Sequence, residues 1–369
     1  MFSTDYKDIL DQIEAIEPVK YGKTRNFIDG AITKLSPYIS RGVISTCQVF
    51  HSVMERGFDP KKIEKFIQEL AWRDYWQQVW IAKGDEINSD LRREQPNVQN
   101  HEMPKALIEA KTGINAIDDA INEYYESGYL HNHVRMYIAS IACNVGKSHW
   151  WVPARWMYYH LLDGDWASNA LSWQWVSGAN AGKEYYANQG NINKYCYTKQ
   201  KGTFLDVNYS EFENMAIPDV LKDAIVPELK TPLPESDELS IDIKKPTLIY
   251  NFYNLDPTWH QYKDVNRVLL LEPSVFKKYP ISQNSIDFMM GLAKNIEGVQ
   301  VFVGEYDELL KEYSINDVTY KEHPLNNYSG LEEPRDWMFS VTGYYRSFFA
   351  FWKKCKKELK QWNQPTLFG

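Results

Sequence analysis

The sequence has no long hydrophobic run and few cysteines. No apolar stretch approaches the roughly 20 residues that a helix needs to cross a bilayer, so we expect no membrane contact. The four cysteines lie far apart, without the paired C-x-x-C spacing of a zinc or redox site. We expect reduced thiols and no metal. The first residues lack a basic-then-apolar leader, which predicts a cytoplasmic protein.

An excess of positive charge is also missing. The 369 residues include 41 Lys and Arg against 49 Asp and Glu, which gives a net charge of −8. Nonspecific nucleic-acid binding is mostly phosphate neutralisation by cations, so this balance argues against a protein that coats nucleic acid. A local basic groove remains open. Neither a G-x-G-x-x-G motif nor a Walker loop is present to hold a nucleotide.

Aromatic residues, in contrast, are abundant. They make up 15% of the chain, with 13 Trp and 25 Tyr. Most of the tryptophans fall between positions 72 and 175, where apolar residues recur at helical spacing. This pattern predicts a helical domain, with its clearest helices at 61–83, 114–127, 133–147 and 165–176.

The pattern changes in the last third of the chain. Residues 214–245 collect prolines and acids without aromatics, which indicates a connector. A helical stretch at 282–295 then lies among short β-type runs at 247–251, 267–272 and 299–304. Strand, helix and strand in this order predict a parallel α/β unit.

We therefore expect a mostly α fold with two domains. Residues 1–206 would form an all-helical domain, and 207–245 an acidic, proline-rich connector. Residues 246–369 would form a small Rossmann-like α/β domain that ends in a C-terminal helix.

Three segments of the helical domain place polar groups where chemistry could use them. In the first, residues 21–45, a loop with the hydroxyls of Thr33 and Ser36 leads through Pro37 into a helix. Free amides and hydroxyls there could face an anion together, and a capped surface helix is the alternative.

The second segment is ELAWRDYW, at residues 69–76. Glu69, Trp72, Arg73 and Trp76 fall at spacings of three and four on a predicted helix, so one face carries a carboxylate, a guanidinium and two indoles. An amphipathic core helix with a Glu69–Arg73 ion pair explains this pattern equally well.

The third segment, residues 128–175, has Arg135 inside a helix, followed by Asp163 and Asp165 on either side of Gly164. Buried polar groups are costly unless they meet each other or a polar ligand. An Arg135–Asp163 pair would be one solution, but making a buried pair gains little net stability. We therefore favour a polar, redox-active ring held among these groups.

Together these segments resemble the flavin-binding domain of the photolyase/cryptochrome family. The resemblance covers residues 21–191 and rests on ITKLSPYISRG, ELAWRDYW, KTG followed by GYLHNHVRM, and LLDGDWASNALSWQW, in that order. It implies FAD bound in a U shape at the base of a cavity.

The resemblance also implies which residues contact FAD. Arg135 and Asp163 match an ion pair against the flavin ring, and Asn169 matches the residue that faces N5. Asn at that position is typical of photolyases, whereas plant cryptochromes usually have Asp. The implied FAD-binding residues are Tyr21, Thr33, Leu35, Ser36, Arg73, Arg135, Asp163, Gly164, Asp165 and Asn169.

A substrate pocket follows from the same resemblance. The walls that hold a flipped-out cyclobutane pyrimidine dimer match Glu69, Trp72, Asn132, Met136 and Trp175. Indoles offer stacking faces to bases, and carboxylate or amide groups can hydrogen-bond base edges. The implied catalytic residues are Glu69 and Asn169, with Trp173 and Trp150 as the proximal and middle members of an electron-transfer chain.

The sequence also departs from the family pattern. The third, surface tryptophan of the electron-transfer chain is missing, so either Trp151, Trp156 or Tyr158 replaces it or photoreduction is slow. His133 and Asn188 stand where relatives have arginines that contact DNA.

Two more departures concern the cofactors. Ile32 replaces a threonine of the phosphate loop, and the α/β domain follows the helical domain instead of preceding it. We therefore expect weakened DNA binding and no second chromophore.

The sequence thus predicts a monomeric, FAD-dependent blue-light photoenzyme that repairs cyclobutane pyrimidine dimers in UV-damaged DNA. A cryptochrome-like photoreceptor without repair activity is the main alternative. A decayed flavin domain kept as an interaction module is a third.

Overall fold

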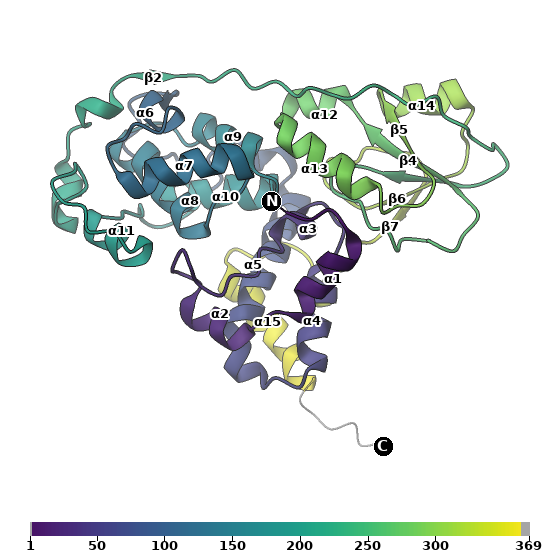
Figure 1. Ribbon diagram of the computed structural model, residues 1–369, viewed down its shortest axis with the longest axis horizontal. Helices are drawn as coiled ribbons and strands as arrows, with labels where there is room; N and C mark the ends of the chain where they lie inside the picture. The colour runs from purple at the N-terminus through teal and green to yellow at the C-terminus, as the bar shows by residue number, and fades with distance from the viewer. Residues whose placement is uncertain (1, 363–369) are drawn as a thin grey trace.

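A helical part and a parallel β-sheet part lie side by side in the computed structural model, which describes residues 2–362 (Figure 1). The helices before the sheet are α1 (Tyr6–Glu14), α2 (Pro18–Thr24), α3 (Ser36–Ser40), α4 (Thr46–Glu55), α5 (Pro60–Lys83), α6 (Lys105–Ile108), α7 (Asn115–Ser127), α8 (Asn132–Ala139), α9 (Trp151–His160), α10 (Trp166–Ser177) and α11 (Gln189–Cys196). A π-helical segment, Ser140–Val145, continues α8. The helices predicted at 61–83, 114–127 and 165–176 are confirmed, and the one at 133–147 is divided between α8 and the π-helical segment.

Helix α5 is the long central element of the helical part. The side chain of Asp59 caps its first turn by accepting from the Lys61 amide at 3.0 Å, and Pro60 occupies the first helical position. The helix ends at Gly84, whose φ of +51° favours glycine. Neither α5 nor any other helix within residues 2–362 has the length and apolar composition of a membrane span.

The sheet consists of five parallel strands in the order β5-β4-β3-β6-β7. They are β3 (Thr247–Tyr250), β4 (Asn266–Leu271), β5 (Val299–Val303), β6 (Val318–Lys321) and β7 (Leu331–Glu333). The three predicted strands and their parallel pairing are confirmed, and β6 and β7 were not predicted. The intervening helices are α12 (Pro273–Lys278), α13 (Gln283–Ala293) and α14 (Tyr306–Tyr313).

Alternate side chains of the strands pack into two separate cores. Leu269 and Leu271 face α13 and join the large core of the helical part. Val268 and Leu270 point to the opposite face, where Leu309 of α14 covers them. The sheet is therefore buried on both faces, and only one of these faces packs against the core of the helical part.

The connector is held to both parts of the molecule. Strand β2 (Ala224–Ile225) pairs antiparallel with β1 (Met103–Pro104) of the helical part. Further along, the amide of Asp237 donates to the carbonyl of Val301 at 2.8 Å, so the connector then follows the β5 edge (Figure 1).

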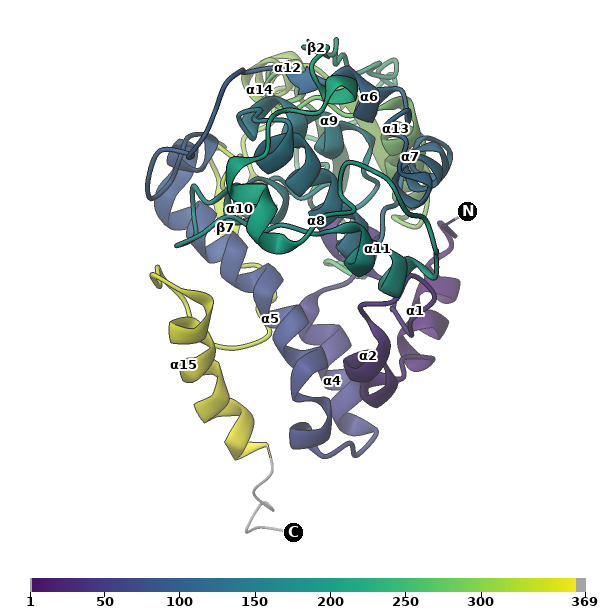
Figure 2. The same cartoon turned by 90° about the vertical axis from the view of Figure 1, so that its left-hand side faces the viewer.

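The last helix, α15 (Phe348–Gln361), packs on α5 and not on the sheet (Figure 2). Trp352 Nε1 donates to Glu64 at 3.3 Å, and Lys356 pairs with the same carboxylate at 2.7 Å. We expected this helix as the end of the α/β domain. In the structure it completes the helical part, which is therefore built from two separate stretches of the chain.

Candidate active site

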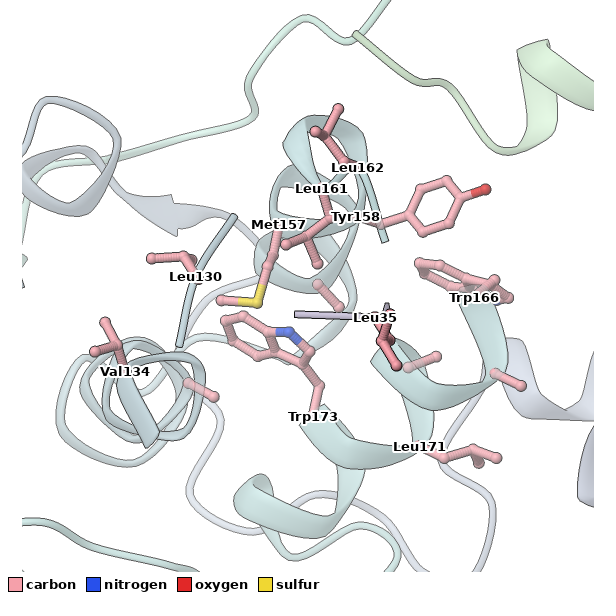
Figure 3. Close-up of a cluster of buried hydrophobic side chains, with 14 of the residues drawn as sticks. Leu35, Leu130, Val134, Met157, Tyr158, Leu161, Leu162, Trp166, Leu171 and Trp173 are labelled. Carbon is pink, nitrogen blue, oxygen red and sulfur yellow. The ribbon is translucent and has the colours of Figure 1, made fainter. Parts of the chain in front are cut away.

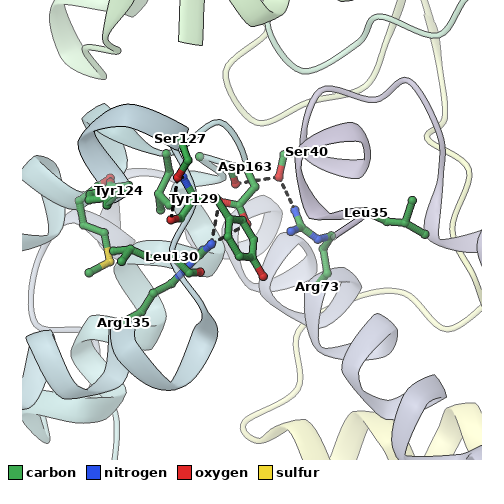
Figure 4. Close-up of polar contacts among 12 residues, drawn as sticks. Leu35, Ser40, Arg73, Tyr124, Ser127, Tyr129, Leu130, Arg135 and Asp163 are labelled. Carbon is green, nitrogen blue, oxygen red and sulfur yellow. Dashed lines mark hydrogen bonds and ion pairs between the residues drawn. The ribbon is translucent and has the colours of Figure 1, made fainter. Parts of the chain in front are cut away.

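Arg135 and Asp163 meet near the centre of the helical part (Figure 4). Nη2 of Arg135 lies 3.0 and 2.9 Å from the two carboxylate oxygens of Asp163, and Nε donates to the carbonyl of Leu130 at 2.9 Å. The Asp163 side chain is only 3% exposed. The pair that the sequence suggested is therefore present, at the junction of α8 with the loop between α9 and α10.

The electrostatics of Asp163 are set by its neighbours. Burial alone would raise its pKa, but the charge of Arg135 and a hydrogen bond from Ser36 outweigh that effect. The pKa of Asp163 therefore lies below its ordinary value, and the carboxylate stays ionised at neutral pH.

Helices α3 and α5 reach the same centre through Ser40. Its hydroxyl donates to the backbone carbonyl of Asp163 at 2.8 Å and accepts from Arg73 Nη1 at 2.7 Å (Figure 4). The predicted cofactor residue Arg73 is thus close to the Arg135–Asp163 pair, because Ser40 joins them.

The alternative explanation of the second segment, a Glu69–Arg73 ion pair, is wrong. Glu69 Oε1 pairs with Arg25 at 3.3 Å and with Lys65 at 3.2 Å. Arg73 faces α3, whereas Glu69 faces α2. Glu69 therefore does not neutralise the guanidinium of Arg73, whose charge lies beside the Arg135–Asp163 pair.

Asp165 and Asn169 lie at the start of α10 and are held from two sides. Asp165 caps the helix by accepting from the Ser168 amide at 2.7 Å, and it also accepts from Gln77 of α5. Asn169 Nδ2 donates to the carbonyl of Ala154 at 2.8 Å. These bonds fix the orientation of both side chains without a direct contact to the Arg135–Asp163 pair.

The predicted phosphate loop is short and partly closed on itself. Thr33 Oγ1 accepts from the amide of Leu35 at 3.4 Å, and Leu35 itself is buried. Ser36 is the first residue of α3. Tyr21 lies apart, edge-on against Phe66 at 5.3 Å, so its link to the loop stays a prediction.

The backbone at Gly164 leaves little room for a side chain. A Cβ there would approach the carbonyls of Leu161 and Tyr158 to 3.0 and 3.2 Å. The carbonyl of Gly164 accepts a hydrogen bond from Arg41. Glycine thus allows the chain to turn tightly between the two aspartates.

Trp173 lies in the apolar floor beside this centre (Figure 3). It is 2% exposed, and Leu35, Leu130, Val134 and Met157 belong to the same cluster. An indole enclosed by aliphatic side chains is shielded from water on most of its surface.

Trp150 is fully buried and contacts Trp151. Its Nε1 donates to Asp90 at 2.6 Å, and its ring centroid is 5.6 Å from that of Trp151 in an edge-to-face arrangement. Trp156 packs instead against Tyr124 and Tyr125. Among the three proposed replacements for the missing surface tryptophan, Trp151 is the one that the structure places against Trp150.

The predicted substrate-pocket residues are not joined by direct contacts. Trp72 stacks on Phe348 of α15, with ring centroids 3.8 Å apart and an interplanar angle of 10°. Asn132 begins α8 and is exposed, and Met136 is half-buried one turn later. Trp175 is exposed on α10, where its ring lies 5.9 Å from that of Tyr185.

The sequence did not predict a cavity of about 740 Å³ between the helical part and the sheet. Ser40, Arg73 and Asp165 form part of its wall, so it adjoins the predicted cofactor residues. The opposite wall includes Asn251, after β3, and His323, after β6. These strands lie where the strand order reverses, which is a common ligand position in parallel sheets.

Two buried polar side chains near this cavity were also missed. Arg41 is fully buried, with its guanidinium 3.3 Å from the ring centroid of Phe252, and burial lowers its pKa to about 10. His323 stacks on Tyr253 at 4.1 Å, and burial lowers its pKa well below the ordinary value. Arg41 lies within the ITKLSPYISRG motif, but no role was assigned to it, and His323 lies in a stretch of sequence that no motif marks.

Comparison with known proteins identifies the class of this helical domain. Residues 66–220 match the family model described as the FAD binding domain of DNA photolyase. Residues 66–220 thus form a photolyase-type FAD-binding domain, and the cofactor of this domain is FAD.

The relatives match less than half of the chain. A deoxyribodipyrimidine photo-lyase of Streptomyces griseus is 33% identical over 149 residues, which are 40% of this chain and 32% of the relative. One from Thermus thermophilus is 31% identical over 166 residues, 43% of this chain and 38% of the relative. The chain thus spans about a third of the length of these curated relatives.

Solved structures with a similar course of the chain include a cryptochrome of Synechocystis sp. PCC6803. Its TM-score is 0.45 at 21% identity, over 52% of this chain and 43% of that one. A bacterial class III photolyase from Agrobacterium tumefaciens has a TM-score of 0.41 at 20% identity, over 57% and 54%.

The polar groups at the centre fit a flavin ring. Its pyrimidine edge carries both hydrogen-bond donors and acceptors, and the structure offers carboxylates, a guanidinium and a carboxamide. Asp163 and Asp165 can accept hydrogen bonds, and the Arg135 side chain remains 23% exposed beside them.

Proposed function

We propose that the protein is a FAD-dependent blue-light photoenzyme that repairs cyclobutane pyrimidine dimers in DNA. The observation that carries this proposal is the buried Arg135–Asp163 pair, joined through Ser40 to Arg73, inside a photolyase-type FAD-binding domain. A buried pair of this kind contributes little net stability by itself. Its retention is explained by a ligand that both charges orient.

Each residue at the centre has a defined task in this proposal. The light-driven electron is the chemistry that FAD supplies when bound. Arg135 and Asp163 would hold the ring in place, and Asp165 would accept a hydrogen bond at its pyrimidine edge. Asn169 would have its carboxamide oxygen free for N5 of the flavin, because its Nδ2 is already bonded to Ala154.

The phosphate loop would hold the other end of FAD. Thr33 would contribute its hydroxyl and Ser36 its backbone amide, because the Ser36 hydroxyl donates to Asp163, while Tyr21, Leu35 and Gly164 would contribute backbone or ring contacts. Ile32 offers no hydroxyl, so we expect this end to bind less tightly than a loop with threonine at that position.

Trp173, Trp150 and Trp151 form the proposed route by which electrons reach the cofactor. Trp150 and Trp173 are buried, and Trp151 is half-buried. Adjacent indole rings can pass an oxidising equivalent between them, and the last ring must be reachable by a reductant in solution. The Trp151→Phe variant should therefore be photoreduced more slowly than the Trp156→Phe control.

Glu69, Trp72, Asn132, Met136 and Trp175 are the proposed substrate residues. Glu69 and Asn132 would hydrogen-bond the pyrimidine edges, and the indoles would stack on the flipped-out bases. The proposal is tested by illuminating the reduced holoprotein with an oligonucleotide that carries a single dimer. Restored thymines support it, and none at high enzyme concentration and low salt would reject it.

A second function, a photoreceptor without repair, is favoured by one observation. Phe348 occupies a face of Trp72 that a base would need, and Trp76 lies against the same indole at 5.1 Å. A receptor of this kind would respond to light but would bind dimer-containing and undamaged DNA equally. Dimer-selective binding by the unmodified protein would exclude it.

A further inference from the structure

Three aromatic rings, two half-buried and one exposed, form a cluster between the α2–α3 loop and the end of α11. The ring of Phe27 lies 5.1 Å from that of Tyr195 and stacks on that of Tyr197 at 5.5 Å, with an interplanar angle of 20°. The amide of Ile28 donates to the carbonyl of Tyr195 at 3.1 Å, which joins the two segments. Tyr197 is 60% exposed. We call Phe27, Tyr195 and Tyr197 the aromatic platform.

The backbone at Tyr197 is unusual for a tyrosine. This residue ends α11 with φ of 55° and ψ of 34°, in the left-handed region. Glycine and asparagine adopt that conformation most easily, and a bulky side chain there is unfavourable. A large exposed ring is thus held where a small residue would be easier, which indicates that the ring itself is used.

The two segments that form the platform are rich in positive charge. Segments 23–34 and 194–201 contain six Lys and Arg residues and one carboxylate, Asp29, in a chain of net charge −8. Lys194, Lys199 and Lys201 are exposed, and Lys194 Nζ lies 5.0 Å from the ring centroid of Tyr195. The surface therefore combines stacking faces with groups that neutralise phosphates.

The platform borders the proposed substrate pocket. Arg25, two residues before Phe27, pairs with Glu69 at 3.3 Å. On the other side the ring of His133, which follows Asn132, lies 4.9 Å from that of Tyr195. The platform thus lies on the side where His133 replaces the arginine of relatives.

We propose that the aromatic platform binds single-stranded DNA and leads it to the substrate pocket. This inference rests on the proposed function, since the strand is the one that carries the dimer. Exposed rings can stack only on bases whose faces are free, and duplex bases are stacked on each other. The platform therefore selects unpaired strands, while the nearby lysines contact the phosphates.

The experiment measures binding of dimer-free oligonucleotides in the dark by fluorescence anisotropy. A single-stranded thymidine oligonucleotide should bind more tightly than a duplex of the same length. Tyr197→Gly removes the ring and suits the left-handed backbone, so it should weaken single-strand binding about tenfold without unfolding the protein. Tyr197→Phe keeps the ring and should retain binding. Tyr262→Ala is the matched control, because Tyr262 is 93% exposed on the sheet part.

A second variant tests the electrostatic contribution. Replacing Lys199 and Lys201 together by alanine should lower the slope of log affinity against log salt by about 0.7 for each charge removed. Circular dichroism and the midpoint of urea unfolding confirm that each variant is folded.

The outcomes separate this inference from the proposed function. Equal affinity for single strands and duplex, or unchanged binding by Tyr197→Gly, would overturn the platform even if dimers are repaired. Selective single-strand binding that depends on Tyr197, without repair under light, supports the platform and rejects the proposed repair.

Discussion

Asp163 is the single residue on which the polar centre most depends. Its carboxylate is buried, and its charge is balanced mainly by Arg135. Removing one member of a buried pair leaves the other charge without compensation, which typically costs about 3–5 kcal/mol.

We therefore expect Asp163→Asn to lower the free energy of unfolding by about 3 kcal/mol at pH 7. The folded-state pKa of Asp163 is depressed, so the carboxylate stabilises the protein above its unfolded pKa, about 4, and this is lost as the pH falls further. The difference between wild type and variant should shrink below pH 4. Urea unfolding measures it, with Asp219→Asn, at an exposed ion pair, as the control. Equal destabilisation by both variants would contradict this prediction.

His160 makes the stability of the protein depend on pH, as an ordinary surface histidine with an unshifted pKa would not. Burial lowers its pKa to about 4, and its ring packs edge-on against Tyr125 at 4.8 Å. The unfolded state binds a proton near pH 6.5, while the folded state does so only near pH 4. The free energy of unfolding therefore decreases as the pH falls from about 6.5 to about 4, because the unfolded state takes up the proton first.

His160→Gln should reduce this loss. Unfolding midpoints at pH 7 and pH 5 measure the effect, and the drop should be smaller in the variant than in wild type. His133, whose pKa is also about 4, leaves a residual pH dependence in the variant. An identical drop in both proteins would show that His160 takes up its proton without unfolding.

Helix α15 is the element whose role differs most from its prediction. The spacing of its apolar residues predicts a helix with one hydrophobic face, but this spacing does not show which part of the protein that face packs against. The structure places Phe348 on Trp72 and Phe351 near Tyr75. Strands β6 and β7 escaped prediction for a related reason, since short strands are defined by their neighbours and carry little pattern of their own.

Phe348→Ala should cost about 3 kcal/mol of stability, because Phe348 is 2% exposed and its removal leaves a cavity. Phe349→Ala is the control, because the adjacent Phe349 is 70% exposed and should cost less than about 0.5 kcal/mol. A double-mutant cycle with Trp72→Ala isolates the stacking contribution, expected at about 1 kcal/mol. A coupling near zero would mean that the two rings touch without stabilising each other.

At the scale of the whole molecule, the helical part and the sheet share one continuous core. Arg335, after β7, donates to Gln77 of α5 at 2.5 Å and to Glu322 at 2.8 Å. Asp74 accepts from the amide of Met338 at 3.0 Å. These bonds run beside the cavity between the two parts.

We expect a single unfolding transition, with equal calorimetric and van't Hoff enthalpies. Arg335→Ala should lower the midpoint, because it leaves Glu322 without its cation at a half-buried position. Two resolved transitions in the unmodified protein would show that the parts unfold independently.

The cavity shows where inference from the sequence ends. The Arg135–Asp163 pair could be anticipated because uncompensated charges within one helical stretch are costly. Ser40, Arg73, Asn251 and His323 come together only through the packing of four distant segments. No local pattern encodes that meeting.

The return of α15 to α5 also affects how the protein is made. Trp352 bonds to Glu64, 288 residues earlier in the chain. At about 5–20 residues per second, a ribosome needs roughly 15–60 s to deliver this partner. During that interval the aromatic stripe of α5 has no cover, and the nascent chain is most vulnerable to aggregation there.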